Sequence, residues 1–194
     1  LRPVYLLRHP LPETPHRAGM TPVLLVGVGN DYRGDDGAGL AVARSLKALG
    51  LPGVAVVEAT GDGASLLDVW QGHEHVVIFD AVSSGAVPGA VHRFDVCARP
   101  LSAKLLRSST HAFGLADAIE LARAMGQLPN HLVVYGVEGK RFEAGAGLSE
   151  EVERAVHGVV EHIARELATH RACARGDNAA FKEAGADSPK GTPG

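Results

Sequence analysis

Residues 26–42 read VGVGNDYRGDDGAGLAV, a pattern typical of a strand, a glycine-containing turn and a helix. This stretch continues an apolar run over residues 22–29, which is typical of a strand buried on both faces of a sheet. Over residues 36–50 the apolar side chains recur at helical spacing up to a glycine, where the helix is expected to stop. A buried strand, a glycine-containing turn and a helix make the first unit of an α/β fold. Two aspartates, Asp35 and Asp36, stand where a dinucleotide-binding turn would hold a phosphate.

The rest of the chain alternates between strand-like and helix-like segments. Only about seven residues separate the strand expected over 75–82 from the next one. That gap is too short for a crossover helix, so we expect the next strand to be an antiparallel neighbour. The alternation predicts a three-layer α/β/α domain with a mostly parallel, twisted, five-stranded sheet and one antiparallel strand. Further strands are expected over 54–60, 90–96 and 131–139, and helices over 64–70, 113–126 and 149–168, the last with Ser149 as its N-cap.

The two ends of the chain differ from the segment between them. Residues 1–20 have no clear period and contain several prolines, so we expect a poorly ordered extension there. Residues 171–194 are small, polar and aperiodic, as in a disordered tail. The folded domain is therefore expected over residues 21–170.

Composition excludes several classes of protein. The net charge of −3 gives no reason to expect binding to nucleic acid or to a membrane surface. No apolar run approaches the roughly 18 residues needed to span a bilayer, and the N-terminal segment lacks the pattern of a secretory signal. The two cysteines, Cys97 and Cys173, do not suggest a disulfide framework. We therefore expect a cytoplasmic protein in a reducing compartment.

Three potential ligands follow three separate strands. Asp36 comes after the first strand, Asp80 ends the third, and His111 lies between the fourth strand and the next helix. In open α/β sheets, ligands bind outside the carboxyl ends of the strands, where neighbouring connections diverge to opposite faces. Two carboxylates and an imidazole on one rim suit a divalent metal that accepts mixed oxygen and nitrogen ligands. We therefore expect a metal site made of these three residues.

Each of these residues also has a simpler interpretation. Asp35 or Asp36 is well placed to cap the following helix, because a carboxylate favours the exposed N–H groups of a helix N-terminus. Asp80 can be an ordinary polar residue at the end of a strand, and His111 can be a helix cap or a surface residue. The case for a metal site depends on all three residues occurring together at one edge of the sheet.

A nucleotide site is the weaker alternative. The dinucleotide fingerprint requires glycine at its first, third and sixth places, and here the sixth place is Tyr32. Asp35 and Asp36 would also repel a pyrophosphate at the helix N-terminus. We therefore expect no nucleotide cofactor.

The sequence resembles the hydrogenase maturation proteases, which trim the large subunit of nickel–iron hydrogenases. Together the matching pieces cover most of residues 22–139 in the right order and spacing. The first, with its G-x-G-N and D-D-G-x-G elements, is fairly specific, and the three together are strongly so. These pieces are LLVGVGNDYRGDDGAGLAVARSL (24–46), VVIFDAVSSGAVPGAVHRF (76–94) and SSTHAFGLADAIELARAMGQLPNHLVVYGVEG (108–139).

The resemblance implies both a catalytic metal site and a substrate. It assigns nickel binding to Asp36, where Glu is common in the family, and to Asp80 and His111. The sequence departs from the family pattern at Gly139, where Pro is frequent. The resemblance implies an endopeptidase that removes a C-terminal extension from a hydrogenase large-subunit precursor after metal insertion, and we expect it to act as a monomer.

Two other functions remain open at this point. A non-catalytic metal-sensing chaperone would bind the same loaded precursor without cutting it. A small nucleotide-binding enzyme would bind NAD or FAD in a manner that survives Asp36→Ala. The three ligands of the first hypothesis include only hard oxygens and one nitrogen, so the chain alone should hold nickel weakly and share the ion with the precursor.

Overall fold

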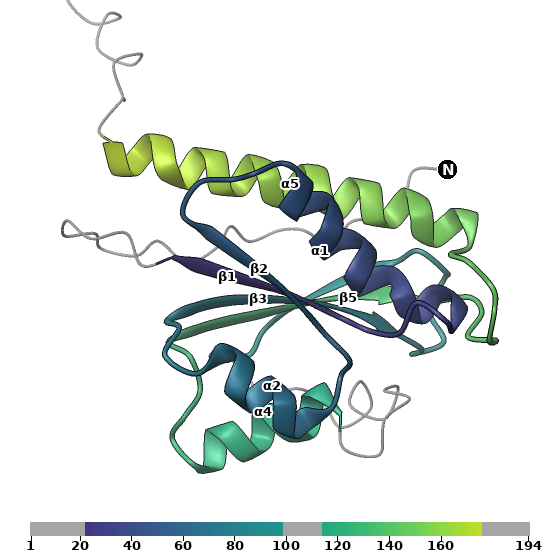
Figure 1. Ribbon diagram of the computed structural model, residues 1–194, viewed down its shortest axis with the longest axis horizontal. Helices are drawn as coiled ribbons and strands as arrows, with labels where there is room; N and C mark the ends of the chain where they lie inside the picture. The colour runs from purple at the N-terminus through teal and green to yellow at the C-terminus, as the bar shows by residue number, and fades with distance from the viewer. Residues whose placement is uncertain (1–21, 99–113, 176–194) are drawn as a thin grey trace, which may run out of the picture.

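The computed structural model describes residues 22–98 and 114–175, which form a sheet with helices on both faces (Figure 1). All five strands lie within one residue of the boundaries expected from sequence. Residues 1–20, and most of the tail expected over 171–194, lie outside the described ranges. The elements are β1 (Val23–Val28), the 3-10 helix η1 (Gly34–Gly37), α1 (Ala38–Ala48), β2 (Val54–Ala59), α2 (Gly63–Trp70), β3 (His75–Val82), β4 (Val91–Asp95), α4 (Leu115–Ala124), β5 (His131–Glu138) and α5 (Glu150–Arg175).

The five strands form one sheet in the order β2-β1-β3-β5-β4. β1 pairs in parallel with β2 and β3, and β3 pairs in parallel with β5, whereas β4 is antiparallel to β5. The expected mostly parallel sheet with one antiparallel strand is therefore confirmed.

The neighbour of β4 is β5 and not β3, the strand that precedes it in the sequence. β5 is buried at every position after its first, so it takes a central place in the sheet between these two strands. The segment 83–90 consequently passes around the end of β5 on its way from β3 to β4. Two strand spacings amount to roughly 10 Å, a distance that eight residues span easily.

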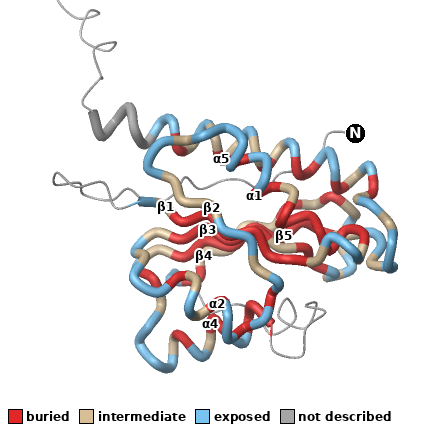
Figure 2. The backbone as a smooth tube through the Cα atoms, in the orientation of Figure 1, coloured by how far each residue is buried: buried red, intermediate tan, exposed pale blue. Residues whose placement is uncertain are grey.

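Two hydrophobic cores lie on opposite faces of the sheet, and buried residues fill the middle of the molecule (Figure 2). Leu25, Phe79 and Tyr135 face α1 and α5. Their strand neighbours, among them Ile78 and Val134, face α2 and α4. This alternation along each strand is the period of two that a sheet covered on both faces requires. The three-layer α/β/α arrangement is thus confirmed.

α5 is longer than its sequence pattern suggests. It begins directly after the expected N-cap Ser149 and continues to Arg175 rather than ending at residue 168. Its buried stripe ends at Leu167, but neither proline nor glycine interrupts the chain before Gly176, so nothing local stops the helix earlier. Within the described ranges, no helix is both long and apolar enough to cross a membrane.

Candidate functional site

The carboxyl ends of β1 and β3 lie side by side at one edge of the sheet, because the two strands pair in parallel. The chain leaves β1 toward α1 on one face and enters β3 from α2 on the other. The connections thus diverge between these strands, which is where ligands bind in open α/β sheets. Asp36 lies in η1, which packs against β3, and Asp80 lies in β3 itself. The structure therefore brings Asp36 and Asp80 close enough at this edge for the charge of Asp36 to act on Asp80.

Glycines in the stretch 26–42 allow η1 and α1 to lie directly against the strands. A Cβ on Gly27 would lie 2.5 Å from the Cβ of Ala43 in α1. Gly29 has a φ of 147°, and a Cβ there would overlap the carbonyl oxygen of Asp36. Both positions therefore exclude any side chain. The two glycines that resemble a dinucleotide turn instead hold Asp36 close to the sheet.

We expect Gly39→Ala to destabilise the protein by about 1–3 kcal/mol, although alanine is the better helix former. Gly39 is in the first turn of α1, and a Cβ there would overlap the carbonyl oxygens of Val28 and Phe79. The helix would have to move away from both strands. Urea denaturation measures the loss, with Gly147→Ala as the control, because a Cβ on Gly147 would meet no atom within 4 Å. A loss no larger than that of the control would contradict this tight packing.

The surroundings of Asp80 disfavour its charged form. Asp80 is partly exposed, but protein atoms surround it closely enough that burial is the main cause of a raised pKa. The backbone N–H of Ala81 donates to Asp80 Oδ1 over 2.8 Å and lowers the pKa, whereas the charge of Asp36 raises it again. Together these effects raise the pKa of Asp80 from 3.8 to about 8.

The chemistry of this pair fits a metal ion. Asp36 is only 4% exposed, so the repulsion between the two carboxylates is poorly screened by water. A divalent cation between them would offset that repulsion and stabilise both charged forms. Asp36 and Asp80 are therefore suitable as two oxygen ligands of one cation.

The third predicted ligand, His111, lies outside the described residues, so its position stays a prediction. Within residues 22–98 and 114–175, no group of three or more His, Cys, Asp and Glu side chains is arranged to hold a metal ion. α4 begins four residues after His111, at Leu115, and covers one face of the sheet. Asp80 belongs to that same face, because side chains alternate along β3 and Ile78 points there.

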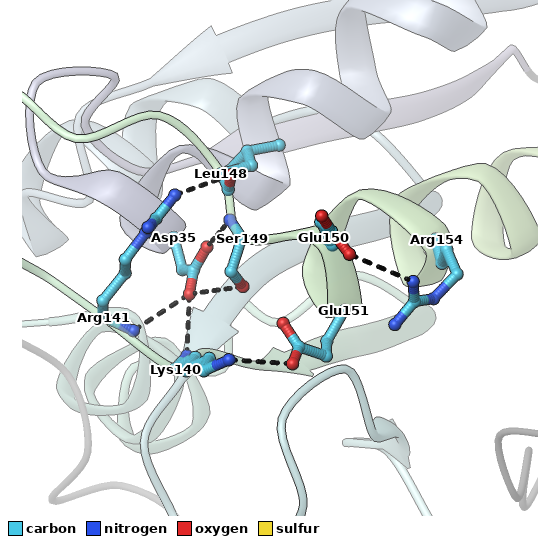
Figure 3. Close-up of polar contacts among 8 residues, drawn as sticks. All are labelled: Asp35, Lys140, Arg141, Leu148, Ser149, Glu150, Glu151 and Arg154. Carbon is cyan, nitrogen blue, oxygen red and sulfur yellow. Dashed lines mark hydrogen bonds and ion pairs between the residues drawn. The ribbon is translucent and has the colours of Figure 1, made fainter. Parts of the chain in front are cut away.

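Asp35 has a different role from Asp36, and Figure 3 shows the polar contacts of the Asp35 side chain. Its buried carboxylate accepts hydrogen bonds from the backbone N–H groups of Lys140 (2.7 Å), Arg141 (3.0 Å) and Ser149 (2.6 Å), and from the Ser149 hydroxyl (3.0 Å). Burial alone would raise the pKa of Asp35, but these hydrogen bonds outweigh it and the pKa lies below its ordinary value. The sequence pattern suggested a helix cap; instead, the residues at the N-cap positions of η1 and α1 are Arg33 and Gly37.

Backbone hydrogen bonds reinforce the connection between the loop before α1 and the segment that joins β5 to α5. The N–H of Gly34 donates to the carbonyl of Ala146 over 3.1 Å, and the N–H of Gly145 donates to the carbonyl of Tyr32 over 2.8 Å. The loop that carries Asp36 is therefore fixed on a second segment, with Asp35 at the centre of the contact.

Glu138, at the end of β5, plays the same role for the segment 83–90. It is 2% exposed, and its Oε1 accepts from the N–H groups of Ser84 (2.8 Å), Gly85 (2.8 Å) and Ala86 (3.1 Å). The Ser84 hydroxyl donates to Oε2 over 2.7 Å, and the N–H of Gly89 donates to the Glu138 carbonyl over 2.8 Å. Sequence reasoning missed this role, although an acidic residue at the end of an uninterrupted apolar strand was an available signal.

The other polar residues after β1 have local roles. The side-chain carbonyl of Asn30 accepts from the N–H of Tyr32 over 2.9 Å. Asp31 accepts two hydrogen bonds from Arg44, at 2.7 and 2.9 Å, and Arg44 also binds Glu58 at 2.6 Å, so the pKa of Arg44 is raised. These three charged side chains are 38–49% exposed, where each pair contributes roughly 0–1 kcal/mol.

Comparison with known proteins gives one consistent family. Residues 40–166 match the family model described as hydrogenase maturation protease (HycI). The hydrogenase expression/formation protein HoxM of Azotobacter vinelandii is 30% identical over 153 residues, which cover 77% of this chain and 73% of HoxM.

Solved structures with the same fold carry related names. The NiFe hydrogenase maturation protease HycI from Thermococcus kodakarensis KOD1 superposes with a TM-score of 0.59 and 25% identity, covering 77% of this chain and 94% of that one. The hydrogenase maturating endopeptidase HybD from E. coli gives a TM-score of 0.57 and 28% identity, covering 76% of this chain and 93% of HybD.

Proposed function

The chain belongs to the hydrogenase maturation protease family, and on that premise we propose that it removes the C-terminal extension of a nickel–iron hydrogenase large-subunit precursor after the metal has been inserted. The observation that supports this function most directly is the pair of Asp36 and Asp80 at the carboxyl ends of β1 and β3. Their mutual repulsion in a poorly solvated site suits a cation that arrives with the substrate.

In this proposal, Asp36, Asp80 and His111 bind the nickel of the loaded precursor. Three ligands, two of them hard oxygens, should hold nickel weakly without help from the precursor. The thiolates that bind nickel best belong to the precursor, so enzyme and substrate share the ion. A precursor without nickel lacks this shared contact and binds less tightly. The enzyme therefore binds the loaded precursor more tightly, and it does not cleave precursor that lacks nickel.

Two routes can activate the water that attacks the peptide bond. Bound nickel would polarise the scissile carbonyl or lower the pKa of a water molecule. Alternatively, Asp80 accepts the proton of the water as a general base, which suits a carboxyl group whose surroundings raise its pKa to about 8. Asp80 is required on both routes, either to hold the ion or to take up the proton.

We propose that the chain acts as a monomer in the cytoplasm. The three proposed ligands come from one chain, so no second copy is needed to complete the site. Cys97 is exposed and is a free thiol, which fits a reducing compartment.

The test is the mass of the precursor after incubation with the purified protein. We expect loss of a C-terminal fragment from nickel-loaded precursor and no change in precursor that lacks nickel. A loaded precursor that binds but keeps its full mass would contradict the peptidase and support the metal-sensing chaperone.

A further inference from the structure

The two most exposed large hydrophobic side chains in the described part of the chain lie near the candidate site. Tyr32 is 80% exposed and Val87 is 77% exposed. Single exposed apolar side chains are common on protein surfaces, so exposure alone decides nothing. Their positions are informative, because Tyr32 lies in the loop that leads from β1 to Asp36 and Val87 lies in the segment that follows Asp80 and β3.

Both loops are held by a buried carboxylate. Asp35 accepts three backbone N–H groups and one hydroxyl, and it ties the loop of Tyr32 to the start of α5. Glu138 accepts three backbone N–H groups and one hydroxyl in the segment of Val87. Burying a carboxylate is costly unless it is fully hydrogen-bonded, so both loops are built to keep one shape.

The backbone around each exposed side chain is also fixed. The N–H of Tyr32 donates to Asn30, and its carbonyl accepts from Gly145. The carbonyl of Val87 accepts from the N–H of Ala90 over 2.9 Å. Two apolar side chains are thus presented to solvent on rigid backbone, an arrangement that lowers the entropy lost on binding a partner.

The two loops also lie near each other and near the Asp36–Asp80 pair. Tyr32 precedes Asp36 by four residues and Val87 follows Asp80 by seven. Both loops approach the start of α5, since the Ser149 N–H donates to Asp35 in the first loop, and a Cβ on Gly89 in the second would lie 2.5 Å from the carbonyl oxygen of Glu151. The exposed side chains of Tyr32 and Val87 are therefore carried by two neighbouring loops beside the pair.

We propose that Tyr32 and Val87 are specificity-determining residues that bind apolar side chains of the precursor on either side of the scissile bond. This inference rests on the proposed peptidase function. It identifies the substrate segment as an extended peptide with apolar residues near the cleavage position. Asp35 and Glu138 are the positioning residues that hold the two loops.

The test is steady-state cleavage of nickel-loaded precursor by Tyr32→Ser and Val87→Ser. We expect each change to raise KM about fivefold to tenfold, the value for losing one apolar contact, with kcat within about twofold of wild type. The unfolding midpoint should be unchanged, because both side chains are exposed.

Leu49→Ser and Met125→Ser are matched controls. Leu49 is 52% and Met125 53% exposed, and they end α1 and α4 at the opposite edge of the sheet, so their KM values should equal that of wild type. If the wild-type protein cleaves the precursor and both loop variants have the same KM as wild type, the inference is overturned but the proposed function is not. Failure of the wild-type protein to cut would overturn the proposed function and the inference together.

Discussion

Asp80→Asn is expected to lower the rate of precursor cleavage by at least about a thousandfold, while the folded protein remains at least as stable as wild type. Asparagine keeps the size of the side chain but cannot bind a cation as a carboxylate does, nor accept a proton from water. The rate is measured from the mass of nickel-loaded precursor over time. Loss of activity without loss of stability separates a functional residue from a structural one.

The free energy of unfolding of the wild-type protein should depend on pH through Asp80. Burial is the main cause that raises the pKa of Asp80 from 3.8 to about 8. Between these values the folded state holds a proton that the unfolded state has released, so stability falls as the pH rises through this window. Asp80→Asn should remove that fall.

Urea denaturation at pH 5 and pH 8, with a chelator present, measures the change in the free energy of unfolding between the two pH values for the wild-type protein and for Asp80→Asn. Asp68→Asn offers a control, because Asp68 is an exposed residue of α2 at the surface of the domain. Substantial cleavage by Asp80→Asn, or a marked loss of its stability at pH 8, would contradict the role given to Asp80.

Asp35→Ala is expected to reduce the free energy of unfolding by about 3–5 kcal/mol. The change would leave the N–H groups of Lys140, Arg141 and Ser149 without their acceptor. It would also release the loop that carries Asp36, so cleavage should fall as well. Urea denaturation at pH 7 measures the loss of stability.

Asp31→Ala is the matched control for this variant, since Asp31 lies in the same loop but pairs with an exposed arginine. Asp31→Ala should lower the free energy of unfolding by less than about 1 kcal/mol. Because hydrogen bonds hold the pKa of Asp35 below 3.8, its contribution is present above about pH 4 and is lost as the pH falls through the folded pKa. Equal losses in the two variants would contradict the structural role of Asp35.

The fold was predictable because the evidence for it is local. β1, β2, β3 and β5 are short, largely apolar runs, and α1 and α5 carry apolar stripes at helical spacing. The position of β4 beside β5 was not predictable in the same way, because strand order depends on which strand fills the central place. The extension of α5 to Arg175 was missed because the apolar stripe, and not the backbone, ends near Leu167.

The site was predictable in part for a related reason. Asp36 follows β1 and Asp80 lies near the carboxyl end of β3, and the carboxyl ends of parallel strands meet at one edge of the sheet. The separate roles of Asp35 and Glu138 depend on loops that are more than 50 residues away in the chain. No spacing rule connects such positions, so only the folded structure could assign them.

We propose that Asp36, Asp80 and His111 bind one metal ion, and crystals soaked in Cd²⁺ or Ni²⁺ show whether they do. We expect an anomalous scattering peak bounded by the carboxylates of Asp36 and Asp80 and by the imidazole of His111, and no such peak in crystals of Asp80→Asn. A peak elsewhere on the protein with none at this position, or a His111 side chain on another side of the molecule, would contradict it.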